Sequence, residues 1–82
     1  MNQIGDGHDV QEIEVTASDL VGKTIRAVNE DIPDGCIVAV IGRGGGSHVP
    51  DADEELEYGD HITFIGEQEA VRQAMKRFHP RD

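Results

Sequence analysis

Five consecutive apolar residues, 37–41, most constrain what this chain can fold into. The run is rich in β-branched side chains, which favour extended backbone, and it is too short to form an independent helix. Because both alternating faces of the run are apolar, we predict a central strand that is buried on both sides. The strand leads directly into Gly-Arg-Gly-Gly-Gly at 42–46, which places a single cation, Arg43, in a flexible turn.

The chain has 82 residues, which favours one small domain. A domain of this size buries only about 60% of the surface that its unfolded chain exposes. A strand that is apolar on both faces needs two covering layers, and a chain this short has little material for both. We therefore expect a homodimer, in which a second copy covers one face of the central strand.

Alternating patterns on either side of the central strand predict further strands. In the segment 11–15, isoleucine and valine alternate with glutamates, and in 61–65 isoleucine and phenylalanine alternate with polar residues. A short extended piece at 47–49 follows the glycines and is expected to form a hairpin with the central strand.

Two segments show helical spacing. Val21, Ile25 and Val28 are four and three residues apart, which predicts a short helix of about two turns. The clearest helix is expected over 67–78, with acidic residues at its start and basic residues at its end, as the helix dipole favours. Its apolar stripe, expected to face the core, consists of Ala70, Val71, Ala74, Met75 and Phe78.

The chain is therefore predicted to be a small α+β domain with the order β-α-β-β-β-α. We expect a mixed or antiparallel sheet with the helices packed on it, and dimerisation through the central region. Residues 1–9 are polar and contain two glycines, so they are interpreted as a disordered lead or an expression remnant. The domain is expected to span residues 10–80.

The formal net charge is −10, which disfavours nucleic acid and anionic membranes as partners. Abundant acidic residues with only two lysines are typical of proteins from salt-loving organisms, although a simple soluble acidic domain has the same pattern. The sequence contains no apolar run of membrane length and no signal-peptide pattern. We expect a soluble, cytoplasmic protein.

No catalytic or metal-binding constellation is apparent. Cys36 is the only cysteine and is expected to be a small core residue. The four histidines lack the spacing of a local metal pair, and the acidic run 51–57 lacks the spacing of a calcium loop, so a solvated loop is expected there. Without a nucleophile or an acid–base pair, we expect that the protein is not an enzyme.

The glycines at 42, 44 and 46 suggest a phosphate loop, but both nucleotide-loop motifs fail because the segment leads into extended backbone. Arg43 is the one residue whose context indicates binding, since a guanidinium beside free glycine N–H groups suits a phosphate or carboxylate. The alternative is an ordinary surface arginine in a hairpin. His48 lies close to Arg43 across the turn and could contribute to the same anion site.

The ordered motifs of the chain resemble the RCK C-terminal domain, also called TrkA-C, from about residue 11 to residue 78. The matching set is Leu20-Val21-Gly22-Lys23-Thr24-Ile25, Gly35, Ile37-Val38-Ala39-Val40-Ile41, Arg43-Gly44-Gly45, Val49-Pro50, Leu56-x-x-Gly59-Asp60 and Thr63-Phe64-Ile65-Gly66. The resemblance implies a dimerising βαβββα unit.

The resemblance further implies a cytoplasmic regulatory domain of a potassium channel, a potassium uptake system or a cation/proton antiporter. Such a domain would lie at the membrane through a transporter subunit and would work with a nucleotide-binding RCK N-terminal domain. Either the sequence is a cut-out domain of a longer protein, or it is a stand-alone module and the nucleotide-binding domain is on a separate chain. Some family members bind cyclic di-AMP at the dimer interface, which implies Ile37, Arg43, His48 and Val49 as ligand contacts. The alternative is a purely structural dimerisation module without a ligand of its own.

Overall fold

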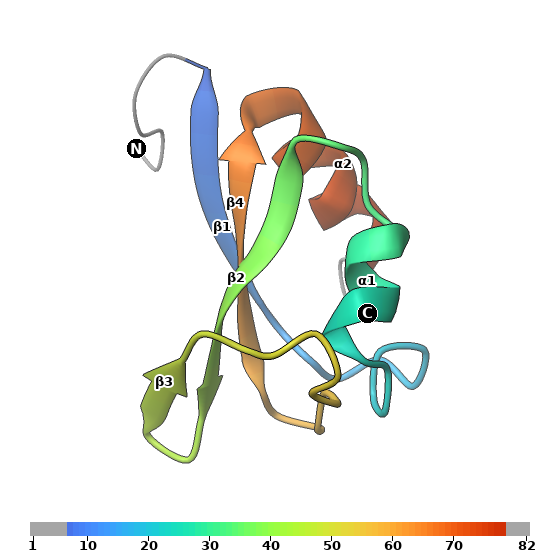
Figure 1. The fold of residues 1–82 in the computed structure, drawn as a ribbon, viewed down its shortest axis with the longest axis vertical. Coiled ribbons are helices and arrows are strands. Elements are labelled where there is room, and N and C mark those ends of the chain that lie inside the picture. The colour runs from blue at the N-terminus through green and yellow to red at the C-terminus, as the bar shows by residue number, and fades with distance from the viewer. Residues whose placement is uncertain (1–6, 79–82) are drawn as a thin grey trace.

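The computed structural model of the chain describes residues 7–78 and shows four strands and two helices there. The strands form one antiparallel sheet in the order β1-β4-β2-β3, which confirms the predicted α+β class and element order (Figure 1). The elements are β1 (His8–Glu14), α1 (Ile25–Glu30), β2 (Cys36–Arg43), β3 (Gly46–His48), β4 (His61–Glu67) and α2 (Gln68–Phe78).

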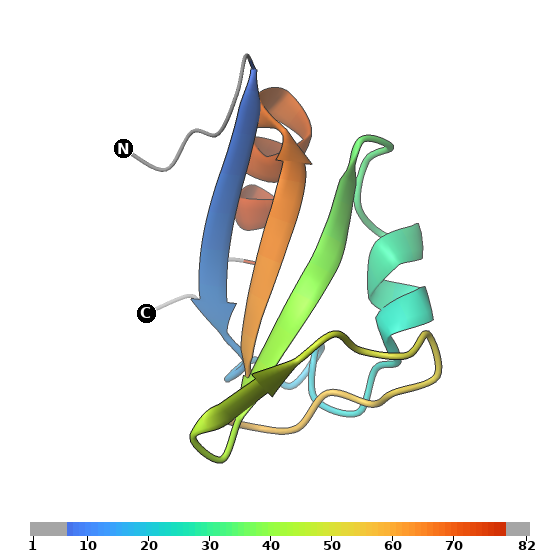
Figure 2. The same cartoon turned by 60° about the vertical axis from the view of Figure 1, so that its left-hand side comes forward.

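Both helices pack against the same face of the sheet, α2 on β1 and β4 and α1 on β2 (Figure 2). The core lies between this inner face and the helices, where Ile41, Ile62 and Phe64 are completely buried. Phe64 stacks on Phe78 of α2 with ring centroids 6.2 Å apart. The predicted stripe of α2 is confirmed, since four of its five residues are buried and Met75 is partly buried.

The single chain buries one face of the central strand, which agrees with the prediction that a second copy covers the other face. Cys36, Val38 and Ile41 of β2 are buried on the inner face, but Ile37 is 54% exposed. A bulge between Val38 and Val40 shifts the inward–outward alternation of side chains by one residue, so that Ile41 is buried on the same face as Val38. The apolar run therefore serves two faces, of which this chain covers one.

The uncovered face carries a small apolar surface of its own. The strand register places Val10, Ile65 and Ile37 side by side across three strands, and Val40 lies next to them beside Thr63. We call Val10, Ile37, Val40 and Ile65 the outer face. Within the described residues, neither helix packs on this side of the sheet (Figure 2).

The first helix has about the predicted length of two turns, but it starts later than its apolar spacing predicts. It begins at Ile25 because Thr24 caps it, with the Thr24 hydroxyl accepting a hydrogen bond from the Ala27 amide at 3.2 Å. Gly22 has a φ of +89°, which interrupts helical backbone, so Val21 lies in the preceding loop and is 41% exposed. Including Val21 in the helical stripe was an error.

The N-terminal strand starts earlier than predicted, and α2 starts one residue later. His8 and Asp9, interpreted from the sequence as part of the lead, pair with Glu67 and Gly66 in the sheet. Residues 1–6 and 79–82, with the rest of that lead and the predicted domain end at residue 80, lie outside the described residues. Neither α1 nor α2 in the described part is long and apolar enough to cross a membrane.

Candidate functional site

A tight hairpin turn positions Arg43, the residue that the sequence selected for binding. Arg43 at the end of β2 pairs with Gly46 at the start of β3, which leaves Gly44 and Gly45 as the two turn residues. Their φ values are +61° and +83°, and positive φ at both positions is typical of the hairpin turn that matches strand twist. The glycines therefore fix a defined turn.

Arg43 makes a two-pronged contact with Asp60. Its Nε donates to Asp60 Oδ1 at 2.8 Å and its Nη2 donates to Asp60 Oδ2 at 2.7 Å, while Nη2 also donates to the Glu55 carbonyl oxygen at 3.1 Å. Asp60 is only 2% exposed and also accepts a hydrogen bond from the Glu57 amide. A paired arrangement of this kind is among the stronger protein hydrogen bonds.

The contact shifts both ionisation equilibria toward the charged forms. Hydrogen bonding to Arg43 is the largest cause that lowers the pKa of Asp60, and hydrogen bonding to Asp60 is the largest cause that raises the pKa of Arg43. Both side chains are therefore charged at neutral pH, and the pair ties the end of β2 to the loop that precedes β4.

The remaining side of the guanidinium faces two further carboxylates. Arg43 Nη1 lies 3.3 Å from Glu54 Oε2 and 3.4 Å from Glu57 Oε2. These ion pairs are longer than the hydrogen bonds to Asp60, and Glu57 is largely exposed. Arg43 thus has one tightly held edge and one loosely held edge.

Glu54 connects Arg43 to His48. The His48 Nε2 atom lies 2.7 Å from Glu54 Oε2 and 2.9 Å from Oε1, and Glu54 Oε2 also faces Arg43. The sequence expectation that Arg43 and His48 lie near each other is confirmed, although a carboxylate lies between them.

Of the other two predicted ligand contacts, Val49 directly follows His48 in the chain, whereas Ile37 lies far from Arg43. Val49 follows β3 and is 79% exposed, while Ile37 lies on the outer face near the opposite end of β2. Arg43 lies six positions after Ile37 along the strand, about 20 Å away at the usual rise per residue. One chain therefore does not gather the four residues into a single pocket, and a common site would need a second copy or a ligand that extends along the strand.

A groove next to Arg43 follows the glycine hairpin. It has a volume of about 390 Å³ and is lined by residues 42–46, Gly59 and His61. His61 was predicted only as an exposed strand residue, and its Nδ1 lies 2.9 Å from Glu12 Oε2 on the neighbouring strand. A β-carbon on Gly42 would lie 3.5 Å from the His61 β-carbon, so the absence of a side chain there keeps the groove open.

Sequence reasoning missed Asp60 as the partner of Arg43. The signal was the Leu-x-x-Gly-Asp motif, in which each marked residue has a structural task. Leu56 is buried in the core, Gly59 has a φ of +90° and donates its amide to the Val15 carbonyl, and Asp60 holds Arg43. The motif makes the turn that carries a buried carboxylate to the end of β2.

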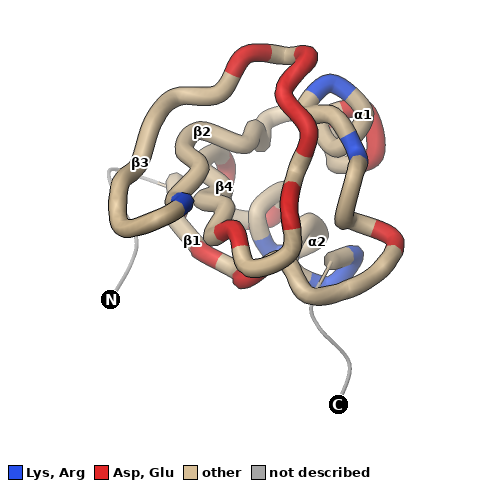
Figure 3. Tube along the Cα trace, turned by 90° about the horizontal axis from the view of Figure 1, so that it is seen from below, with Lys and Arg blue, Asp and Glu red and all other residues tan. Residues whose placement is uncertain are grey.

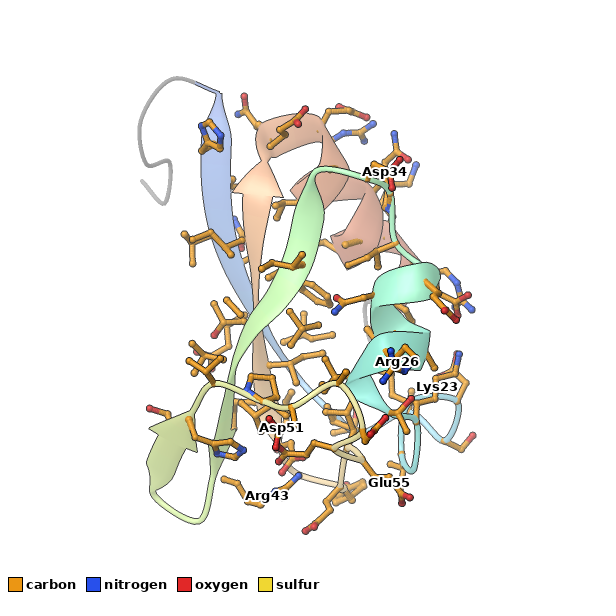
Figure 4. The ribbon with its side chains drawn as sticks, in the orientation of Figure 1. Lys23, Arg26, Asp34, Arg43, Asp51 and Glu55 are labelled. Carbon is orange, nitrogen blue, oxygen red and sulfur yellow. The ribbon has the colours of Figure 1, made fainter. Side chains whose placement is uncertain are left out.

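The loop between β3 and β4 places further acidic residues around this end of the sheet, as Figure 3 shows from below. Arg43, Asp51 and Glu55 lie at this end in Figure 4, while Asp34 lies at the opposite end. The expected solvated acidic loop is confirmed for Asp51, Asp53, Glu55 and Glu57, which are exposed, but Glu54 is half-buried. Among the described residues, no group of three or more acidic, histidine or cysteine side chains could hold a metal ion.

Comparisons with known proteins agree with this architecture. A family model described as the TrkA-C domain matches residues 10–79. No curated protein matches the chain. Among solved structures, the RCK_C domain dimer of S. agalactiae BusR in complex with c-di-AMP is 30% identical, with a TM-score of 0.69 over 88% of this chain and 97% of that chain.

Two further structures extend the comparison. S. agalactiae BusR in complex with its busAB-promotor DNA is 33% identical over 84% of this chain, with a TM-score of 0.66, but the match spans only 34% of that chain. The RCK C domain of the potassium transport protein KtrA in complex with c-di-AMP is 23% identical, with a TM-score of 0.65 over 88% of this chain and 85% of that chain. At this identity, the likeness to KtrA establishes the fold alone.

Proposed function

The chain belongs to the TrkA-C domain family, and we propose that it is a ligand-sensing regulatory domain of potassium or other monovalent-cation transport. In this role it acts as a subunit or part of a channel, an uptake system or a cation/proton antiporter, on the cytoplasmic side of the membrane. A nucleotide-binding RCK N-terminal domain is the expected companion, on the same chain or on another. The role is regulatory and involves no catalysis.

The family match across residues 10–79 carries this proposal, because it covers nearly all of the described chain. The BusR domain, 30% identical over almost its whole length, is a dimer that holds c-di-AMP, and the KtrA domain also holds this nucleotide. We therefore propose c-di-AMP as the ligand, with Ile37, Arg43, His48 and Val49 as its contacts. Arg43 supplies a guanidinium that can donate hydrogen bonds to a phosphate of the ligand.

The outer face supports a homodimer as the working unit. Ile37 exposes more than half of its side chain, and Val10, Val40 and Ile65 lie beside it on a surface that no helix in the described chain covers. A second copy placed there would bury Ile37, which is exposed, and the remaining accessible surface of the half-buried Val10, Val40 and Ile65. Burial of a fully exposed aliphatic side chain contributes about 1.5 kcal/mol or more, so Ile37 gains most. The second copy would also supply the second covering layer that the apolar run requires.

Calorimetry with c-di-AMP tests the ligand. We expect saturable binding that His48→Ala and Val49→Ser weaken, because both side chains are exposed and their loss leaves the core intact. Gln73→Ala on α2 is the control and should bind as the wild type does. Arg43→Ala is unsuitable alone, since it leaves the buried Asp60 carboxylate unpaired. An absence of binding heat with c-di-AMP and with other nucleotides would contradict the ligand proposal.

The dimer is tested by light scattering at high salt. We expect a dimer that Ile37→Asp converts to a monomer with an unchanged circular dichroism spectrum, because Ile37 contributes little to the core of its own chain. An intact dimer combined with no ligand binding would favour the alternative, a structural dimerisation module. A wild-type monomer would count against both.

That this domain does not bind nucleic acid remains a prediction, which rests on its net charge. One matched structure is BusR in complex with promotor DNA, although the matched region is 34% of that chain. A net charge of −10 opposes direct contact of this domain with phosphate backbones. Gel-shift titration with duplex DNA should therefore show no binding by the chain on its own.

A further inference from the structure

Arg43 presents two edges of different character to its surroundings. The Nε and Nη2 atoms hold the buried Asp60 through hydrogen bonds of 2.8 and 2.7 Å. Nη1, on the remaining side, faces Glu54 and Glu57 at 3.3 and 3.4 Å. A guanidinium binds anions through its N–H groups, so the Nη1 side is the one that an anionic ligand can reach without disturbing Asp60.

Both carboxylates on that side can move with little cost to the fold. The Glu57 side chain is 66% exposed, and ion pairs of exposed groups contribute little to the stability of a fold. Glu54 is less exposed, but its two oxygens lie 2.9 and 2.7 Å from His48 Nε2. His48 therefore leaves Glu54 with a hydrogen-bond partner after a ligand has displaced it from Arg43.

We propose that Glu54 and Glu57 are internal competitors for the anion site on Arg43, which a phosphate or carboxylate ligand must displace in order to bind. The inference rests on the proposed ligand-sensing function and names how the same site is regulated. Asp60 is the positioning residue that holds the guanidinium, while Glu54 and Glu57 act as a displaceable cover on its open edge.

The arrangement predicts that Glu54 and Glu57 lower the affinity of Arg43 for an anionic ligand. An anion gains contact with Arg43 only by giving up the two ion pairs already present, so its net gain is smaller than that of a free guanidinium. The carboxylates also repel the incoming charge until they move. Removing one of them should therefore strengthen anion binding, although the fold loses an ion pair.

Neutral isosteres separate this local effect from the change in total charge. Glu54→Gln and Glu57→Gln each remove one negative charge beside Nη1. Glu55→Gln is the matched control, because Glu55 lies in the same loop and is exposed, and only its backbone carbonyl contacts Arg43. Thermal unfolding of each variant establishes that the fold is retained, and Glu57→Gln serves if Glu54→Gln fails to fold.

Calorimetric titration with c-di-AMP, at matched ionic strength, is the measurement. We expect Glu54→Gln or Glu57→Gln to bind about threefold to tenfold more tightly than the wild type, as the loss of an ion pair of this exposure implies. Glu55→Gln should change affinity less. Equal affinity in all four proteins, or an equal gain in all three variants, would overturn the inference.

Inorganic pyrophosphate, followed by the NMR signal of the Arg43 Nε–H group, gives an independent readout. A shift of this signal at lower pyrophosphate concentration in Glu54→Gln or Glu57→Gln than in Glu55→Gln would support the inference, even if no protein binds c-di-AMP. That combination would refute the nucleotide ligand and leave the competition intact. If no variant responds to pyrophosphate or c-di-AMP, the Nη1 edge is not an anion site and the inference fails.

Discussion

Different interactions hold the two ends of β2 in place: close backbone packing at one end and a pair of opposite charges at the other. At the first end, Cys36 lies against Gly66 in β4, and the Gly35 carbonyl accepts a hydrogen bond from the Glu67 amide at 2.8 Å. A β-carbon on Gly66 would lie 1.9 Å from the Gly35 oxygen, so the backbones meet where no side chain fits. At the other end, Arg43 is held by the buried carboxylate of Asp60.

Because of this difference, salt and pH should affect the stability of the two ends of β2 unequally. Close backbone contact depends on shape, so salt and pH should affect the Cys36 end little. The Arg43 end depends on charge, and its outer ion pairs are exposed to screening. A domain that senses an anion gains from this division, because one end of the strand can respond while the other keeps the sheet fixed.

The largest effect should come from Gly66→Ala. Its methyl group would collide with backbone atoms that cannot rotate away, so we expect a loss of about 3 kcal/mol or more in the free energy of unfolding. Gly42→Ala in β2 is the control, because the nearest atoms to its β-carbon lie at ordinary contact distances of 3.5 Å and more. Urea unfolding at two salt concentrations measures both. If the Gly66→Ala protein were as stable as the Gly42→Ala protein, close backbone contact would not be what holds the Cys36 end of β2.

Asp60→Asn should have the next largest effect, at the charged end. The substitution leaves the shape unchanged but removes the charge that pairs with Arg43, and we expect a loss of about 2 kcal/mol in the free energy of unfolding. Asp53→Asn is the control, since Asp53 and Arg26 are both exposed and their pair contributes little. Equal losses in the two variants would show that the burial of Asp60 is irrelevant.

Acidification should reveal the same pair in the unmodified protein, with a smaller effect. The pKa of Asp60 is lowered in the folded state, chiefly by hydrogen bonding to Arg43, so the folded protein binds this proton less readily than the unfolded chain. The resulting stability is fully present above the unfolded value of about 3.9 and is lost as pH falls through the lower folded pKa. Between neutral pH and pH 2, the free energy of unfolding should therefore fall more steeply with decreasing pH in the wild type than in Asp60→Asn. Parallel curves would contradict the assignment.

These contrasts also explain which features the sequence could predict. Alternation and helical spacing identified the strands and α2, because core burial imposes those periods on residues such as Phe64 and Val71. The start of α1 was missed because the backbone of Gly22 and the Thr24 cap, rather than apolar spacing, determine it.

The candidate site was predicted only in part. Arg43 was identifiable as a lone cation among glycines, but its partner Asp60 is 17 residues away and is brought close only by the turn before β4. Long-range pairing of this kind leaves no local period in the sequence. The exposure of Ile37 agrees with the prediction that one chain covers only one face of the central strand, although the five apolar residues alone do not show which face is left open.

The smallest effect concerns the turn that presents Arg43, and Gly45→Ala isolates it. The β-carbon would meet no atom within 4 Å, so the only cost is the positive φ of +83°, about 1 kcal/mol for a residue with a side chain. Gly46→Ala is the matched control, because Gly46 has no positive φ and its β-carbon would lie 4.0 Å from the Arg43 carbonyl oxygen. Urea unfolding should show a loss for Gly45→Ala, near zero for Gly46→Ala, and no dependence on salt in either. A loss that grows with salt would mean that the turn and the Arg43–Asp60 pair are coupled, and that shape and charge act together even at this end of the strand.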